Sequence, residues 1–153
     1  MYFDVNELKK NVVDIIKGLG EKPEEAKWAA DCLIKADMRG ISTHGVHLLK
    51  PISQRVKAGM LTLPTKLEII KDDGATAVID GNNGLGPVAS HRAMEICIKK
   101  AKEYGVGIVL TRNTNNIGSL ADYAQLAAEE NMIAIVSGNA APAMAPWGGA
   151  SLS

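Results

Sequence analysis

The spacing of apolar side chains changes once along this chain, near residues 61–64, and this change constrains the fold more than any other feature. Before it, apolar residues recur every three or four positions, which is the period of an amphipathic helix. After it, short runs rich in β-branched residues alternate with longer segments of helical period. The pattern predicts the α/β class: a helical segment over residues 1–62, followed by an α/β domain over residues 63–153.

The helical segment is predicted to contain three helices, over residues 5–19, 23–38 and about 43–58. Asp4 and Glu7 have the spacing of a capping box, and Pro23 suits the first turn of the second helix. Ser42 or Thr43 is the expected cap of the third helix.

The second part of the chain is predicted to form an incomplete α/β layer. A turn at residues 72–74 joins two β-rich runs, which is typical of a hairpin. The expected strands cover residues 67–71, 75–80, 106–111 and 133–136, and the expected helices cover residues 87–103 and 119–130. Residues 137–153 form a loop rich in Gly, Pro and Ala with no element after it, so we expect a domain truncated at its C-terminus.

Composition excludes several classes of partner. Lys and Arg together number 17, as do Asp and Glu, so the chain lacks the net positive charge that binding to a phosphate backbone requires. No apolar stretch approaches the roughly 20 residues that cross a bilayer, and the N-terminus does not have the order of a signal peptide. Cys32 and Cys97 lie outside any metal-binding pattern and are predicted to be free, buried thiols. We expect a cytoplasmic protein without a metal, nucleic acid or membrane partner.

Of the three histidines, only His44 has surroundings that indicate chemistry. It stands between Thr43 and a glycine at a predicted helix start, and imidazole exchanges protons near neutral pH. The plain alternative is a partly exposed histidine that is hydrogen-bonded to a neighbour. His47 and His91 are predicted to be surface or packing residues.

Two polar segments follow predicted strands, where α/β proteins often bind ligands. Residues 80–86 (Asp-Gly-Asn-Asn-Gly-Leu-Gly) have exposed amides that could hold a phosphate, or they form a tight structural connection. Residues 113–118 (Asn-Thr-Asn-Asn-Ile-Gly) either contact a ligand through their amides or form a turn in which Asn tolerates unusual backbone angles.

Four motifs occur in order along the chain. They are residues 39–46 (Arg-Gly-Ile-Ser-Thr-His-Gly-Val), the glycines of residues 80–86, residues 105–118 with their Asn-rich end, and residues 145–149 (Ala-Pro-Trp-Gly-Gly). In this order they resemble the NAD(P)-dependent type-2 malate/L-lactate dehydrogenase family, which includes ureidoglycolate, sulfolactate and diketogulonate oxidoreductases. The resemblance covers essentially the whole chain. It implies the non-Rossmann α/β fold of that family with an N-terminal helical segment.

The resemblance also implies an activity: hydride transfer between NAD or NADP and a small 2-hydroxy/2-oxo acid such as malate or lactate. It gives His44 the role of catalytic histidine and places Ser42 and Thr43 beside the substrate. The cofactor-binding positions that it implies are Asn139, Pro146, Gly148 and Gly149. It further implies a homodimer with the active site near the subunit interface.

Three positions depart from the family pattern. Asn116 stands where the family typically has a second histidine, Leu48 where it has an arginine, and Ile52 where it has a tyrosine. An asparagine cannot accept a proton, and a leucine cannot grip a carboxylate. Two hypotheses follow: a dehydrogenase in which His44 alone transfers the proton, or a non-catalytic binding or assembly protein that keeps the fold and the dimer surface.

Overall fold

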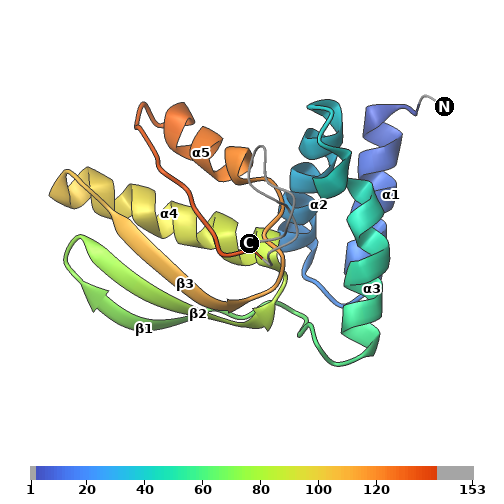
Figure 1. The fold of residues 1–153 in the computed structure, drawn as a ribbon, viewed down its shortest axis with the longest axis horizontal. Helices are drawn as coiled ribbons and strands as arrows, with labels where there is room; N and C mark the ends of the chain where they lie inside the picture. Colours follow the sequence, from blue (N-terminus) through green and yellow to red (C-terminus); the bar gives the residue numbers. More distant parts are fainter. Residues whose placement is uncertain (1–2, 141–153) are drawn as a thin grey trace, which may run out of the picture.

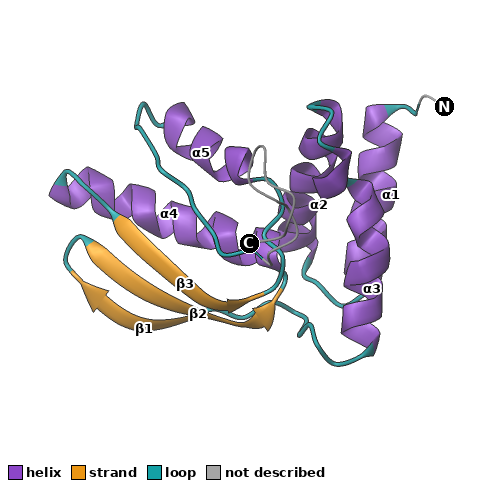
Figure 2. Ribbon diagram, in the orientation of Figure 1, coloured by secondary structure: helices purple, strands orange, loops and turns teal. Residues whose placement is uncertain are grey.

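The structure is a computed structural model that describes residues 3–140, and it combines helices with a three-stranded sheet (Figure 1; Figure 2). The helices are α1 (Val5–Gly18), α2 (Pro23–Met38), α3 (Leu49–Lys57), α4 (Gly86–Tyr104) and α5 (Leu120–Glu129). The strands are β1 (Glu68–Asp73), β2 (Thr76–Gly84) and β3 (Ile108–Thr114). The α/β class and the N-terminal helical segment predicted from the sequence are confirmed.

Local capping signals set where the first two helices begin. The Asp4 carboxylate accepts a hydrogen bond from the Glu7 amide at 2.9 Å, which satisfies one of the free donors at the start of α1. Pro23 occupies the first position of α2, where its missing N–H costs nothing. The apolar faces of α1 and α2 then pack together around Ile16 and Leu33, which are both fully buried. The first two predicted helices are confirmed with their caps.

The sheet has the order β1-β2-β3. β1 and β2 form the predicted antiparallel hairpin, and β3 lies parallel to β2 after the crossover through α4. α4 packs against β2 and β3 and also contacts α2 and α5, so it lies between the sheet and the helices (Figure 1). Ala77 and Ile79 of β2 are buried beneath it.

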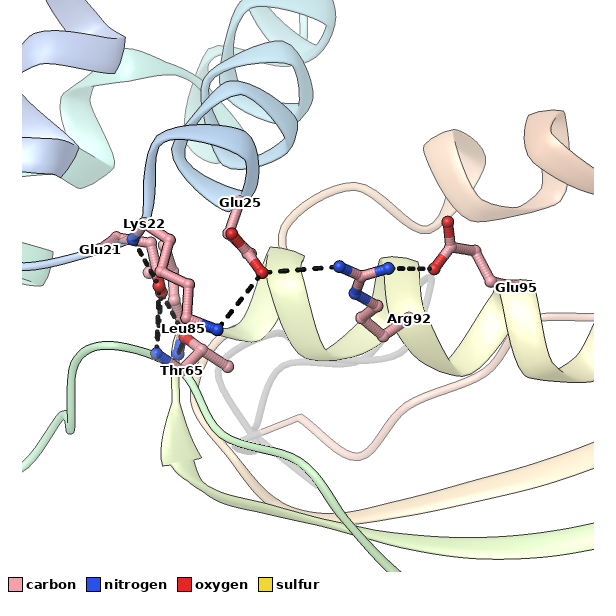
Figure 3. A network of polar contacts seen from close by, with 7 residues as sticks. All are labelled: Glu21, Lys22, Glu25, Thr65, Leu85, Arg92 and Glu95. Atoms are coloured by element: carbon pink, nitrogen blue, oxygen red, sulfur yellow. Dashed lines mark hydrogen bonds and ion pairs between the residues drawn. The ribbon is translucent and has the colours of Figure 1, made fainter.

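A buried carboxylate joins the helical segment to the α/β layer (Figure 3). Glu21, which lies just before α2, accepts hydrogen bonds from the amide and the hydroxyl of Thr65. The same hydroxyl oxygen accepts a hydrogen bond from the Leu85 amide at 2.9 Å, directly before α4. A buried charge is tolerated only when it is well hydrogen-bonded, and Glu21 has these donors together with the Lys22 amide. The network fixes the linker against both parts of the chain.

A second set of contacts joins α2 to α4. The Trp28 ring stacks on His91 with centroids 4.0 Å apart, and the Arg92 guanidinium lies 4.3 Å from the centre of the Trp28 ring. Arg92 also pairs with Glu25 at 3.5 Å and with Glu95 at 3.0 Å (Figure 3). His91 is therefore a packing residue, as predicted, while His47 is exposed.

The third predicted helix begins later than the sequence indicates. Ser42–His44 and Val46–Leu48 form two short 3-10 turns, α3 starts only at Leu49, and neither Ser42 nor Thr43 caps it. The reason is a hydrogen bond from the Val46 amide to the Asp37 carboxylate of α2, which holds the backbone out of a continuous helix.

The strand predicted over residues 133–136 is wrong. These residues make no backbone hydrogen bond to any other residue in the described range, and the side chains of Ile133 and Ile135 are 99% and 96% exposed. A short apolar run such as Ile-Ala-Ile-Val favours a strand, but a strand forms only where a neighbour supplies the hydrogen-bonded ladder. The strands that do form extend past their predicted ends, so that β2 includes residues 81–84 and β3 includes residues 112–114.

Candidate functional site

A carboxylate at the end of α2 positions the loop that carries His44. The Oδ2 atom of Asp37 accepts a hydrogen bond from the Val46 amide at 2.8 Å. A Cβ atom at Gly45 would lie only 1.9 Å from Asp37 Oδ1, so no larger residue fits there. The glycine that follows His44 therefore lets Asp37 hold the turn.

Within this turn, His44 is half-buried, whereas Ser42 and Thr43 are exposed. The Thr43 hydroxyl oxygen lies 3.0 Å from His44 Nδ1. This contact occupies one ring nitrogen and leaves Nε2 to exchange a proton with a ligand.

A small cavity of about 120 Å³ lies between α3, the start of α4 and the loop after β3. Its apolar walls come from Leu33, Leu48, Pro51, Ile52, Leu61, Leu85 and Pro87, and its remaining lining residues are Arg55, Asn115, Asn116 and Gly118. The cavity is thus apolar on most sides and polar along one edge. That combination is typical of a site for a small molecule with one polar end.

The polar edge of the cavity is built from a guanidinium and two side-chain amides. Arg55 Nη1 donates a hydrogen bond to Asn115 Oδ1 at 2.9 Å, and Asn115 Nδ2 donates to the Asn83 carbonyl at 2.8 Å. Asn116 Oδ1 accepts a hydrogen bond from the Gly118 amide at 2.8 Å. Because its oxygen accepts this bond, the Nδ2 group of Asn116 remains available as a hydrogen-bond donor.

Glycines allow this loop to lie against the start of α4. A Cβ atom at Gly86 would lie 2.0 Å from the Asn116 carbonyl oxygen, and one at Gly118 would lie 2.8 Å from Cys32 Sγ. Gly81 and Gly84 make similar close contacts, with Thr114 and Thr65. These contacts favour the structural interpretation of residues 80–86.

Asp80, the acidic residue of that segment, is held entirely by protein groups. It accepts hydrogen bonds from the Asn82 amide at 2.8 Å, from Asn113 Nδ2 at 2.7 Å and from Arg112 Nε at 2.9 Å. The Asn82 amide, followed by the two side chains, holds the pKa of the Asp80 carboxyl below its usual value. Asp80 thus fixes the ends of β2 and β3 in its charged form.

The structure brings together some of the predicted site residues. Leu48 and Asn116 line the same cavity, whereas Ser42, Thr43 and His44 are not among its lining residues and form the 3-10 turn that precedes Leu48 in the chain. Asn139 is exposed and follows Gly138, at which a Cβ atom would lie 3.2 Å from Ile117 Cδ1 beside the Asn-rich loop. Pro146, Gly148 and Gly149 lie outside the described residues.

Two residues of the site are missed by the sequence analysis. The sequence gives one local signal for Asp37. A carboxylate near the C-terminus of a helix interacts unfavourably with the helix dipole, so its presence there indicates another role. The sequence gives a weaker signal for Arg55. Ile52 lies four residues after Leu48 and Arg55 lies three residues after Ile52, so the three side chains share one face of a helix. Both side chains act through partners that are distant in sequence, and no helical pattern reveals such partners.

Neither cysteine takes part in this site. Cys32 is buried, Cys97 is half-buried, and both are free thiols. Over residues 3–140, no group of three His, Cys, Asp or Glu residues could hold a metal ion. Among the helices in the same range, none is long and apolar enough to span a membrane.

Comparison with known proteins places these features in a family. A sequence model described as malate/L-lactate dehydrogenase matches residues 3–152, nearly the full length of the chain. The chain belongs to the malate/L-lactate dehydrogenase family. The resemblance drawn from its motifs is confirmed.

Two dehydrogenases are similar to this chain. The L-sulfolactate dehydrogenase of Methanocaldococcus jannaschii is 43% identical over 141 residues, which are 92% of this chain and 41% of that protein. The malate dehydrogenase of Pyrococcus horikoshii is 44% identical over 138 residues, covering 90% of this chain and 38% of that protein. The solved structure of the Pyrococcus horikoshii enzyme superposes with a TM-score of 0.83, at 40% identity over 85% of this chain and 37% of that one. The chain therefore spans about two fifths of the length of these relatives.

Proposed function

We propose that this chain forms part of an oxidoreductase that uses NAD or NADP to interconvert a 2-hydroxy acid and a 2-oxo acid. The observation that carries the proposal is the family match over residues 3–152, together with a small cavity lined by residues of two of the motifs, Leu85 from residues 80–86 and Asn115, Asn116 and Gly118 from residues 105–118. The named activities of the relatives, sulfolactate and malate dehydrogenation, are reactions of this class.

In this proposal, different residues of the chain exchange the proton of the acid, bind its oxygen and contact its apolar part. His44 exchanges the proton of the substrate hydroxyl through Nε2, while the Thr43 hydroxyl holds Nδ1 and so fixes the ring. Asn116 donates a hydrogen bond from its side-chain amide to the oxygen on C2, and Ser42 completes the polar surface near His44. Leu48 contributes an apolar wall.

The cavity beside Arg55 is not a dinucleotide site by itself. A cavity of about 120 Å³ is smaller than the roughly 300–1,000 Å³ of ordinary small-molecule sites. It has room for part of a small acid but not for a dinucleotide. Of the cofactor positions implied by the resemblance, only Asn139 lies in the described range. The assignment of NAD or NADP therefore rests on the family, and residues 146–149 are proposed to contribute to it.

The assay of this proposal measures NADH oxidation with a panel of 2-oxo acids. We expect the chain alone to reduce pyruvate or oxaloacetate below enzymatic rates, because the cavity beside Arg55 is too small for a dinucleotide and the chain spans about two fifths of its relatives. Joined to the C-terminal three fifths of the Pyrococcus horikoshii malate dehydrogenase, it should oxidise NADH. His44→Ala should then lower the rate by about 10²- to 10⁴-fold.

The matched control is His47→Ala, which removes an exposed histidine three residues away and should change the rate by no more than about twofold. A folded chimera that is inert with every acid would refute the proposed activity. Equal rates for the His44→Ala and unsubstituted chimeras would refute the role of His44.

We also propose that the chain self-associates, with a homodimer as the expected assembly. Leu110 of β3 is 62% exposed, and Ile133 and Ile135 are almost fully exposed. Large exposed apolar patches in soluble proteins usually mark surfaces that bind another protein. Sedimentation should give twice the monomer mass, and a stable monomer at high micromolar concentration would contradict this. The free thiols of Cys32 and Cys97 suit the reducing cytoplasm that we propose as the compartment.

A further inference from the structure

Arg55 differs from the other arginines of the chain in having no carboxylate partner within the described residues. Arg39 pairs with Asp122, Arg92 with Glu25 and Glu95, and Arg112 with Asp80. The one side-chain hydrogen bond of Arg55 in that range goes to the neutral oxygen of Asn115. A guanidinium has five donors in a fork that matches a carboxylate, so Arg55 keeps most of its capacity to bind an anion.

The contact with Asn115 also positions this guanidinium. Asn115 Nδ2 donates hydrogen bonds to the carbonyls of Asn83 at 2.8 Å and Gly84 at 3.3 Å, which fixes its oxygen toward Arg55. Both residues line the cavity. The charge is therefore held at the cavity edge before any ligand binds, which lowers the entropic cost of binding one.

Asn116 follows Asn115 in the sequence and lines the same cavity. In a 2-oxo or 2-hydroxy acid, the carboxylate and the oxygen on C2 are on adjacent carbons. A guanidinium and a neighbouring amide donor match this pair: Arg55 takes the carboxylate, and Asn116 donates to the C2 oxygen.

Among the described residues, Arg55 is the one charged group that lines the cavity, so none of the others can receive a second anion. The cavity walls are apolar, formed by Leu33, Leu48, Ile52, Leu61, Leu85 and Pro87. Malate carries a second carboxylate and sulfolactate a sulfonate, and burial of either group without a partner is strongly unfavourable. Binding of an acid with an aliphatic side chain is instead favoured, in proportion to the apolar area of that side chain that the cavity buries.

We propose that Arg55 binds the substrate carboxylate and that this cavity selects 2-hydroxy and 2-oxo monocarboxylic acids with an uncharged aliphatic side chain. This inference rests on the proposed function and deepens it by naming the substrate class and the residue that binds it. Leu48 and Ile52 determine the specificity because they make the wall beside Arg55 apolar.

The experiment measures binding of two stable 2-hydroxy acids, (S)-2-hydroxy-4-methylpentanoate and (S)-malate, by NMR titration of the side-chain amides of Asn115 and Asn116. The branched monocarboxylate should bind at least about tenfold more tightly than malate. Arg55→Ala should weaken its binding by about 10- to 100-fold, the usual range for loss of a charge-assisted hydrogen bond. Arg55→Lys should recover part of this, since it restores the charge but not the fork.

Lys57→Ala is the matched control, because it removes a cation from the same helix at a position that does not line the cavity. It should leave both affinities unchanged. Leu48→Arg supplies a second cation and should raise the affinity for malate by about tenfold. Amide spectra establish that each variant is folded.

The outcomes separate this inference from the function on which it rests. Tighter binding of malate than of the branched acid, or binding that is indifferent to Arg55→Ala, would overturn the substrate class or the role of Arg55 and leave a 2-hydroxy acid site in place. Failure of both acids to bind the folded chain would instead count against the proposed function itself.

Discussion

The buried hydroxyl of Thr65 gives the sharpest test of how the two parts of the chain are joined. Thr65→Val keeps the shape of the side chain but removes the oxygen that donates to Glu21 and accepts from the Leu85 amide. Leu85 is 1% exposed, so water cannot replace the lost acceptor. An unsatisfied buried donor costs about 1–3 kcal/mol, and a lost hydrogen bond to a charged group costs a similar amount. We expect the free energy of unfolding to fall by about 3 kcal/mol.

Urea denaturation followed by circular dichroism measures this change. With a slope of about 2 kcal/mol per molar, the midpoint should fall by about 1.5 M. The matched control is Thr62→Val in the same linker, where the side chain is exposed and makes no hydrogen bond within the described residues. It should shift the free energy by no more than about 0.5 kcal/mol. If the two variants lower the midpoint equally, the Glu21 network does not hold the linker as argued.

Three further predictions concern single residues. Gly86→Ala should displace the loop at Asn116, because the added Cβ would lie 2.0 Å from the Asn116 carbonyl oxygen. Amide NMR spectra should show shifted loop signals, and urea denaturation should show that the free energy of unfolding falls by at least about 2 kcal/mol. Burial, followed by the charge of Asp122, raises the pKa of the Cys32 thiol to about 11, so in a Cys97→Ser variant Ellman's reagent at pH 8 should react only after unfolding. Burial against Trp28 lowers the pKa of His91 below its usual 6.5, which favours the neutral ring in the folded state. The contribution of His91 to the free energy of unfolding is therefore present above about pH 6.5 and is lost as the pH falls below that value. In His91→Phe, the free energy of unfolding should depend less on pH in this range.

The elements that the sequence predicts well are those fixed by neighbours along the chain. The Asp4 cap, Pro23 and the 3.6-residue period locate α1 and α2, because each signal acts within one or two turns. The hairpin of β1 and β2 follows in the same way from its turn residues. The late start of α3 could not be predicted, because it depends on the Asp37 carboxylate nine residues before Val46.

The same distinction between local and distant contacts applies to the candidate site. Leu48 and Asn116 line one cavity although 68 residues separate them in the sequence, and their roles there stay predictions. Arg55 could not be singled out, since a cation on an exposed helix face is ordinary and its partner Asn115 lies 60 residues further along the chain. Only the folded chain brings the guanidinium to the cavity.

The walls of the cavity come from both parts of the chain: Leu33, Leu48 and Arg55 lie before the linker, and Leu85 and Asn116 lie after it. A ligand in the cavity therefore binds only while the two parts are docked, and its binding free energy is added to that of docking. At a ligand concentration of about 100 times Kd, this linkage amounts to about 2.7 kcal/mol. A suitable acid should thus restore most of the stability lost in Thr65→Val. A thermal-shift screen on that weakened variant would then rank acids by affinity, with no cofactor and no turnover required.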